Sequence, residues 1–327
     1  MRALLRLRSL ALAGLLGIAC AAPRQDPQGG QRPPPGPPPM PGKESPRATG
    51  GEAAPALRPG ELPAGATAEA RAAWETVGKA SLGAAGDRAP VDRFELALDV
   101  RYRGGSRGTN DLQAEYRFLA PGYVRVRTVE SRKVVGRGPE GDWLYDEPRD
   151  ERVRIGAGRE YAEDRRQLEE WAGIARNFVA LTDPRSLRIA GLEILPRAPA
   201  VLPEALAKRG SELAWLAVRS PDFRLVGAPP GTAQFRASLG YDRRSCAVEL
   251  ALVEEDVRDA RLLPDAKLVQ LGDPRPAGGF LVPYRILVYS IEEGRAPAAF
   301  TAVPGMDLVV KSANLRPAFG PEAFRSP

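Results

Sequence analysis

The sequence predicts a mainly antiparallel β domain with α-helices, in which a curved sheet wraps over its helical cover as an incomplete barrel. Two observations predict this fold class. Between residues 94 and 155, apolar and polar side chains alternate with a period of two in short segments separated by turns, a pattern typical of half-buried strands. Two amphipathic segments, around Trp74 and Trp171, have the period of a helix. Because a sheet with one continuous apolar face needs a cover, the two helices are expected to lie on that face.

The first half of the domain begins with a helix. Thr67 is the expected N-cap, and the helix is predicted to end near residue 83. An antiparallel meander of about six strands should follow, at residues 94–102, 112–118, 124–128, 131–137, 142–146 and 152–155. A long amphipathic helix is then predicted over about 159–181, followed by a short helix that ends near residue 189.

The second half returns to strands. Residues 212–218 are interpreted as helical, and the later strands are expected at residues 223–226, 235–239, 247–253, 267–271, 281–289 and 306–310. Whether the space between sheet and helices is packed solid or left hollow decides the function, and the sequence leaves both alternatives open.

The first 19 residues have the order of a cleaved secretory signal. Three arginines precede an apolar run of nine residues, and small residues surround Cys20. Nine residues are too few for a transmembrane helix, which needs roughly 20. Cleavage before Cys20 resembles processing at a bacterial lipobox, where the cysteine receives diacylglycerol, although Gly17 stands where leucine is usual. Cleavage after Ala21 or Ala22 by an ordinary signal peptidase is the alternative.

A disordered tether is predicted after the signal, over residues 20–65. Residues 23–65 contain 13 prolines and 8 glycines and almost no residue able to build a core. Fully extended, this arm would span roughly 130 Å at about 3.1 Å per residue. We therefore expect an exported protein, lipid-anchored through Cys20 at the periplasmic face of the cell envelope, with the outer membrane favoured over the inner one. The folded domain is predicted over residues 66–327, and its single Cys246 is expected to be a small buried hydrophobe.

Charge and composition exclude several classes of function. The first 65 residues hold 8 of the 47 basic and 4 of the 41 acidic residues, so the net charge of the domain is only +2 and no basic cluster marks a nucleic-acid site. The chain has no histidine, which excludes Ser-His-Asp and Cys-His catalytic pairs and the usual zinc sites. The acidic runs at 254–256 and 292–293 are interpreted as solvated loops in preference to a glycosidase pair. No enzyme activity, metal, cofactor or nucleic-acid partner is therefore expected.

One glycine motif matches a nucleotide-binding fingerprint by spacing alone. Gly136, Gly138 and Gly141 spell G-x-G-x-x-G, but that fingerprint belongs between a strand and a helix. Here a strand follows, at residues 142–146, so the motif predicts a hairpin connection.

Short motifs spread along the domain resemble the LolA/LolB lipoprotein-carrier family. They are Phe118-Leu119-Ala120-Pro121-Gly122-Tyr123-Val124-Arg125-Val126, Glu140-Gly141-Asp142-Trp143-Leu144-Tyr145-Asp146-Glu147-Pro148, Gly278-Gly279-Phe280-Leu281-Val282-Pro283, and a closing segment with Pro317, Glu322, Phe324 and Pro327. The resemblance implies a half-barrel of about eleven strands with helices closing its mouth. It also implies an apolar cavity that takes acyl chains of a lipid or a lipoprotein.

The function that this resemblance implies is a membrane-tethered carrier or acceptor of lipidated proteins or lipids, with a carrier or sorting protein as a further partner. The alternative is an envelope binding or sensing module that uses the same fold without transport. The candidate cavity residues are the inward-facing apolar side chains of the strands and of the long helix: Phe94, Leu96, Leu98, Tyr116, Phe118, Val124, Val126, Trp143, Trp171 and Phe178. For each of them, ordinary core packing is an alternative that is at least as well supported as contact with a ligand.

Overall fold

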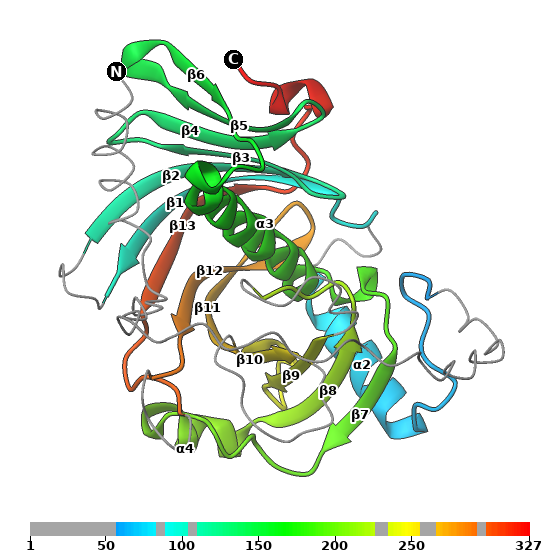
Figure 1. The fold of residues 1–327 in the computed structure, drawn as a ribbon. Helices are drawn as coiled ribbons and strands as arrows, with labels where there is room; N and C mark the ends of the chain where they lie inside the picture. The colour runs from blue at the N-terminus through cyan, green and yellow to red at the C-terminus, as the bar shows by residue number, and fades with distance from the viewer. Residues whose placement is uncertain (1–56, 83–88, 104–109, 226–234, 256–265, 293–298) are drawn as a thin grey trace, which may run out of the picture.

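The computed structural model describes residues 57–82, 89–103, 110–225, 235–255, 266–292 and 299–327, and these residues form one antiparallel sheet of 13 strands curled around a long helix (Figure 1). The strand order is β6-β5-β4-β3-β2-β1-β13-β12-β11-β10-β9-β8-β7. The predicted fold class, a curved antiparallel half-barrel sheet with helices, is confirmed. The sheet has 13 strands where the family resemblance implies about eleven.

The first six strands form the predicted meander. They are β1 (Arg93–Tyr102), β2 (Asn110–Leu119), β3 (Tyr123–Thr128), β4 (Lys133–Gly138), β5 (Gly141–Asp146) and β6 (Glu151–Arg154). In β1 buried and half-buried side chains alternate along nearly the whole strand, as the period of two predicts. The meander runs outward from the middle of the sheet to its β6 edge.

The long helix α3 (Ala162–Thr182) carries the chain from the β6 edge to the opposite edge of the sheet. Figure 1 shows it lying inside the curve of the sheet. The 3-10 turns η2 (Arg159–Tyr161) and η3 (Pro184–Ser186) flank it, and η3 stands where a longer helix to residue 189 was expected. The preceding helix α2 (Ala68–Ala80) begins as predicted, because Thr67 Oγ1 accepts a hydrogen bond from the amide of Ala70 at 3.1 Å.

The second half returns strand by strand to the middle of the sheet, where β13 pairs with β1. Its elements are β7 (Gly191–Leu195), α4 (Glu204–Glu212), β8 (Ala214–Ser220), β9 (Phe235–Tyr241), β10 (Val248–Glu255), β11 (Lys267–Ala277), β12 (Phe280–Tyr289) and β13 (Met306–Asn314). β7 is a strand that the sequence reading missed.

Two predictions in this half are wrong. Residues 212–218, expected to be helical, form the end of α4 and most of strand β8. β8 is buried on both faces, between a cluster that contains Leu216 and Val218 and one that contains Leu213 and Trp215, so it lacks the alternation that marks a strand in sequence. Residues 223–225, expected to be part of a strand, have no regular structure, and residue 226 lies outside the described residues.

Cys246 also differs from its prediction. It is half-buried in the turn between β9 and β10, with a φ of 59°, and not in the core.

The last part of the predicted tether, residues 57–65, lies against the domain, since the amide of Gly60 donates to the carbonyl of Leu187 at 3.0 Å and Leu62 packs on the cluster around α2. The predicted signal and the rest of the tether, residues 1–56, lie outside the described residues.

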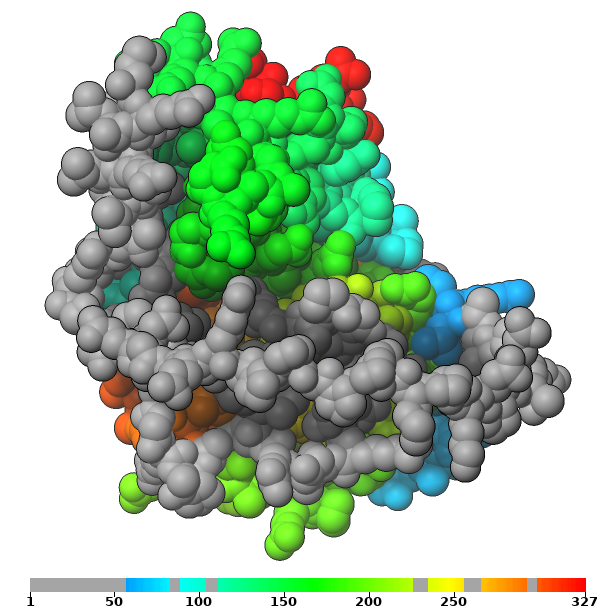
Figure 2. Space-filling model, viewed as in Figure 1, coloured from blue at the N-terminus to red at the C-terminus, as the bar shows by residue number. Residues whose placement is uncertain are grey.

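The G-x-G-x-x-G motif forms the β4–β5 hairpin, as predicted. Gly138 pairs with Gly141, and Gly141 has a φ of 103° that favours glycine. Gly136 pairs with Trp143 on the convex face, where the Trp143 indole Nε1 donates to the carbonyl of Phe324 at 2.9 Å. The C-terminal residues, red in Figure 2, lie directly against this half of the sheet.

Gly136→Ala is expected to destabilise the fold by about 1–3 kcal/mol, because a methyl group at this position would overlap the indole ring of Trp143. Urea unfolding followed by tryptophan emission measures the change. Gly272→Ala in β11 is the control, since its methyl group would meet its nearest neighbour at an ordinary 3.8 Å. Equal stability of the two variants would contradict the predicted overlap.

Candidate functional site: a cavity beneath helix α3

A cavity of about 150 Å³ lies inside the curve of the sheet, between α3 and strands β1, β11, β12 and β13. Packed clusters border it on two sides. One joins β1–β3 to α3, and the other joins α2 to β7–β9. Phe94 is fully buried in the first cluster, with its ring centroid 5.0–5.3 Å from those of Tyr116, Phe118 and Phe178. The space between sheet and helices is therefore packed at the two sides and hollow in the middle.

The inner part of the cavity is apolar. Leu96 and Leu98 of β1 face Phe178 and Leu181 of α3, and strands β11 and β12 contribute Val269, Leu271, Pro283, Ile286 and Val288. Several of these large side chains are only half-buried although they point into the fold, because the hollow leaves them without neighbours. An engineered apolar cavity of about 150 Å³ stays dry and binds benzene, so a hollow of this size and lining is suited to a small apolar group.

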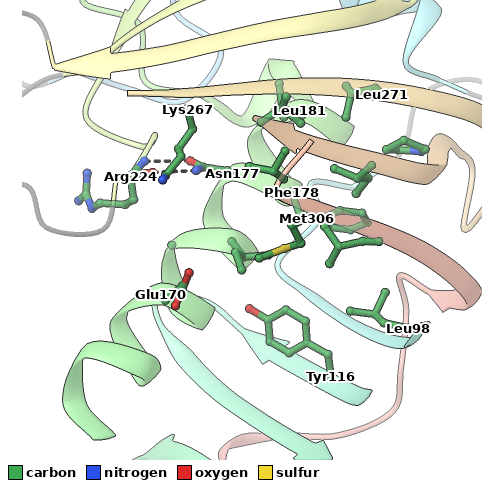
Figure 3. A pocket seen from close by; sticks show the side chains of 18 of the residues that line it. Leu98, Tyr116, Glu170, Asn177, Phe178, Leu181, Arg224, Lys267, Leu271 and Met306 are labelled. Atoms are coloured by element: carbon green, nitrogen blue, oxygen red, sulfur yellow. Dashed lines mark hydrogen bonds between the residues drawn. The ribbon is translucent and has the colours of Figure 1, made fainter. Parts of the chain in front are cut away.

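The polar part of the cavity lies at one edge of the sheet. β1 ends there at Tyr102 and β13 begins at Met306, directly opposite. β12 ends next to Ser290 and β11 begins at Lys267, whose Nζ donates to Ser290 Oγ at 3.4 Å. Moving from this edge along the strands, the lining changes from Tyr102, Ser290 and Lys267 to aliphatic side chains. Figure 3 shows the same polarity, with Glu170, Arg224 and Lys267 to one side of the pocket and Leu98 and Leu271 to the other.

One face of α3 shows the same change from polar to apolar residues along the cavity. Glu170, Gly173, Ile174, Asn177, Phe178 and Leu181 line the cavity at helical spacing, so that the charged residue faces the polar end and the apolar residues face the interior. Asn177 anchors the backbone of Arg224, which lines the cavity opposite this face of α3. Its Nδ2 donates to the carbonyl of Arg224 at 2.7 Å, and its Oδ1 accepts from the amide of Arg224 at 2.8 Å.

Two polar atoms of the cavity are enclosed and have no hydrogen-bond partner among the described residues: Oε2 of Glu170 and the hydroxyl of Tyr102. Burial raises the pKa of Glu170, against the lowering effect of the Arg166 and Lys267 charges. Burial also raises the pKa of Tyr102, and the charge of Glu170 adds to the rise. The phenol is therefore neutral at physiological pH, and Glu170 is more readily protonated than an exposed glutamate.

The guanidinium of Arg224 is engaged locally. It donates to the carbonyls of Pro221 and Phe223 and lies 5.7 Å from the centroid of the Phe235 ring. Burial lowers its pKa, and the Arg176 charge lowers it further.

Among the described residues, no group of three acidic or cysteine side chains could hold a metal ion. No described helix is long and apolar enough to cross a membrane.

Three solved structures match most of this chain at low sequence identity. A LolA superfamily protein from Nitrosomonas europaea matches with a TM-score of 0.40 and 11% identity over 79% of this chain and 97% of its own. A domain described as an outer membrane lipoprotein-sorting protein, from Vibrio parahaemolyticus, matches with a TM-score of 0.41 and 9% identity over 78% and 97%. A DUF1329 family protein from Desulfovibrio piger matches with a TM-score of 0.40 and 12% identity over 79% and 98%.

LolA-superfamily structures are thus among those similar to this chain, as the sequence motifs predict. No protein-family model matches the sequence, and no curated protein matches it. The function proposed below therefore depends on the cavity of this chain.

The predicted cavity residues separate into three groups. Four line the cavity: Leu96, Leu98, Tyr116 and Phe178. Five belong to the packed cluster between the sheet and α3: Phe94, Phe118, Val124, Val126 and Trp171. Trp143 faces away from the cavity, on the convex side of the sheet, because the alternation along β5 directs it toward the C-terminal residues. Cys20, the predicted lipidation site, lies outside the described residues.

The sequence reading missed the polar end of the cavity, made by Tyr102, Glu170, Asn177, Arg224 and Lys267. One signal was available in α3, where Glu170 shares a helical face with Ile174 and Phe178 and is thus a lone carboxylate on an otherwise apolar stripe. The other residues come together only through the pairing of β13 with β1, which joins segments about 200 residues apart in the sequence.

Glu170→Gln is expected to raise the melting temperature at neutral pH, and the gain should disappear in acid. A carboxyl whose folded-state pKa is raised binds a proton on folding, so its contribution to stability is present below the ordinary glutamate pKa and lost as the pH rises through the raised value. Glutamine resembles the protonated form at every pH, so the advantage should be absent below about pH 4. Thermal melting from pH 4 to 8 measures it, with Glu75→Gln on the exposed side of α2 as the control. A gain independent of pH would contradict this cause.

Proposed function

We propose that the protein binds the end of an acyl chain, from a lipid or from the lipid part of a lipidated protein, in the cavity beneath α3. The observation that carries this proposal is the hollow itself, which is apolar inside and polar at one end. Such a lining matches an amphiphile whose head lies at the polar edge and whose adjoining carbons lie in the apolar part. The binding needs no covalent chemistry.

The size of the cavity favours an acceptor over a carrier that extracts its cargo whole. A space that accommodates benzene holds about six carbons, which gains about 5 kcal/mol at about 0.8 kcal/mol per buried methylene. A complete chain of ~16 carbons would gain about 12 kcal/mol before costs. The cavity therefore supports binding of about six carbons at the head end of one chain, while the rest of a longer chain stays outside the cavity, in a membrane or in another protein.

A lipid anchor on Cys20 would suit this role. It would hold the domain at the periplasmic face of the envelope on an arm of proline-rich sequence, within reach of lipids and of a protein that delivers them. The outer membrane is the membrane we propose for the anchor.

Native mass spectrometry of the protein extracted from membranes tests both proposals together. We expect a diacylglyceryl-modified N-terminal cysteine, absent from the Cys20→Ser variant, and a bound acyl ligand released on unfolding. A domain that retains no amphiphile, and binds none when titrated, would contradict the binding function. Recovery of one protein partner at equal stoichiometry with an empty cavity would favour the non-transporting sensing module.

A further inference from the structure

The polar end of the cavity contains two hydrogen-bonding atoms that the described residues leave unused. Tyr102 is 6% exposed, and both its hydroxyl and Oε2 of Glu170 are enclosed and unpaired. Enclosed polar atoms in native proteins nearly always have a partner. Tyr102 and Glu170 both line the cavity, so the cavity is the side from which a partner can come.

The cations at this end are already engaged, in contrast to the two oxygen atoms. Lys267 Nζ donates to Ser290, and Arg224 is bonded to two backbone carbonyls and stacked near Phe235. A carboxylate or phosphate head would have to share these cations with their present partners. It would also bring only acceptor atoms beside Glu170, and would bind only where Glu170 is protonated.

An ammonium head has the opposite difficulty. It would suit an ionised Glu170, but Lys267 and Arg224 line the same end of the cavity and Arg166 also acts on this carboxylate. A hydroxyl group avoids both conflicts. It can donate a hydrogen bond to Glu170 when this residue is a carboxylate, or accept one when it is a carboxylic acid. In the first case the oxygen of the ligand hydroxyl accepts from the Tyr102 phenol, and in the second case the ligand hydroxyl donates to it.

We infer that Tyr102 and Glu170 form a head-group subsite for a neutral, hydroxyl-bearing amphiphile with a single chain, such as a fatty alcohol or a monoacylglycerol. This inference rests on the proposed function and adds its ligand class. The chain runs from the sheet edge at Tyr102 and Met306 toward Leu98 and Leu271, and the hydroxyl stays between β1 and α3.

The test is a competition experiment with the purified protein, in which unlabelled ligands displace the apolar fluorophore N-phenyl-1-naphthylamine. The decisive pair is 1-dodecanol and its methyl ether, which share a chain and differ in the hydroxyl donor. Dodecanol is expected to bind about tenfold more tightly. Laurate and dodecylamine, tested at the same pH, should both bind more weakly than dodecanol.

Variants assign the preference to the two residues. The double variant Tyr102→Phe with Glu170→Leu should bind both ligands with the affinity that the wild type has for the ether. Tyr289→Phe is the matched control, because Tyr289 lies in the cluster against α4 and its hydroxyl donates to Gln270 at 3.1 Å. It should keep the tenfold preference, and melting curves verify that all variants are folded.

The outcomes separate this inference from the proposed function. Equal binding of dodecanol and its ether by the wild type would overturn the subsite, with acyl binding intact, and would assign the two enclosed oxygens to water. Tighter binding of laurate or dodecylamine would also overturn it. Failure of every probe to displace the fluorophore would overturn the acyl-binding function itself.

Discussion

Val288→Phe is expected to weaken binding of a single-chain amphiphile by about tenfold or more. Val288 lies on the cavity side of β12, opposite Met306. A phenyl ring there would occupy much of a space that holds about six carbons, and excluding only two methylenes removes about 1.6 kcal/mol, which is slightly more than tenfold in affinity. Displacement of a bound fluorophore by dodecanol measures the loss.

The same substitution one strand away provides the control. Val309 of β13 pairs with Arg285 and is 37% exposed on the convex face, so Val309→Phe adds the same ring outside the cavity. It should leave the affinity unchanged. Equal weakening in both variants, accompanied by equal loss of melting temperature, would show that the effect comes from strain in the sheet and would contradict binding in this cavity.

The sequence predicts the elements correctly where each of them has one solvent-exposed face and one buried face. β1 is the clearest case, since its alternation from Phe94 to Tyr102 reappears as alternating burial. α3 is a second case, because its length and its buried residues Leu168, Trp171 and Ala175 follow from the helical period. β8 could not be predicted in this way, because hydrophobic clusters cover both of its faces and its sequence therefore does not alternate between apolar and polar residues.

The cavity was only partly predictable, for a different reason. Phe94 and Leu98 look alike in the sequence, as inward-facing apolar residues of one strand, yet one is packed among aromatic rings and the other borders a hollow. The difference depends on which side chains β11, β12 and α3 place opposite them. That information is non-local, because the facing residues are between about 80 and 190 positions away in the chain.

Phe94→Ala should therefore destabilise the protein far more than Ile286→Ala. Phe94 is fully buried among three aromatic rings, and its removal should cost about 3–5 kcal/mol. Ile286 is half-buried and already faces the hollow, so its truncation should cost about 1 kcal/mol. In melting temperature this is a loss on the order of 10 °C for Phe94→Ala and of about 3 °C for Ile286→Ala.

Urea unfolding of protein freed of bound lipid measures the two values, and dodecanol binding adds an independent readout. Ile286→Ala enlarges the cavity by about three carbons, so in a series of 1-alkanols the chain length at which affinity stops rising should increase from about six carbons to about nine. Phe94→Ala, in the packed cluster, should leave the chain-length preference of the folded molecules unchanged. Costs of similar size at both positions would mean that the space around Ile286 is filled in solution. The cavity would then be part of the core, and the binding function would lose its physical basis.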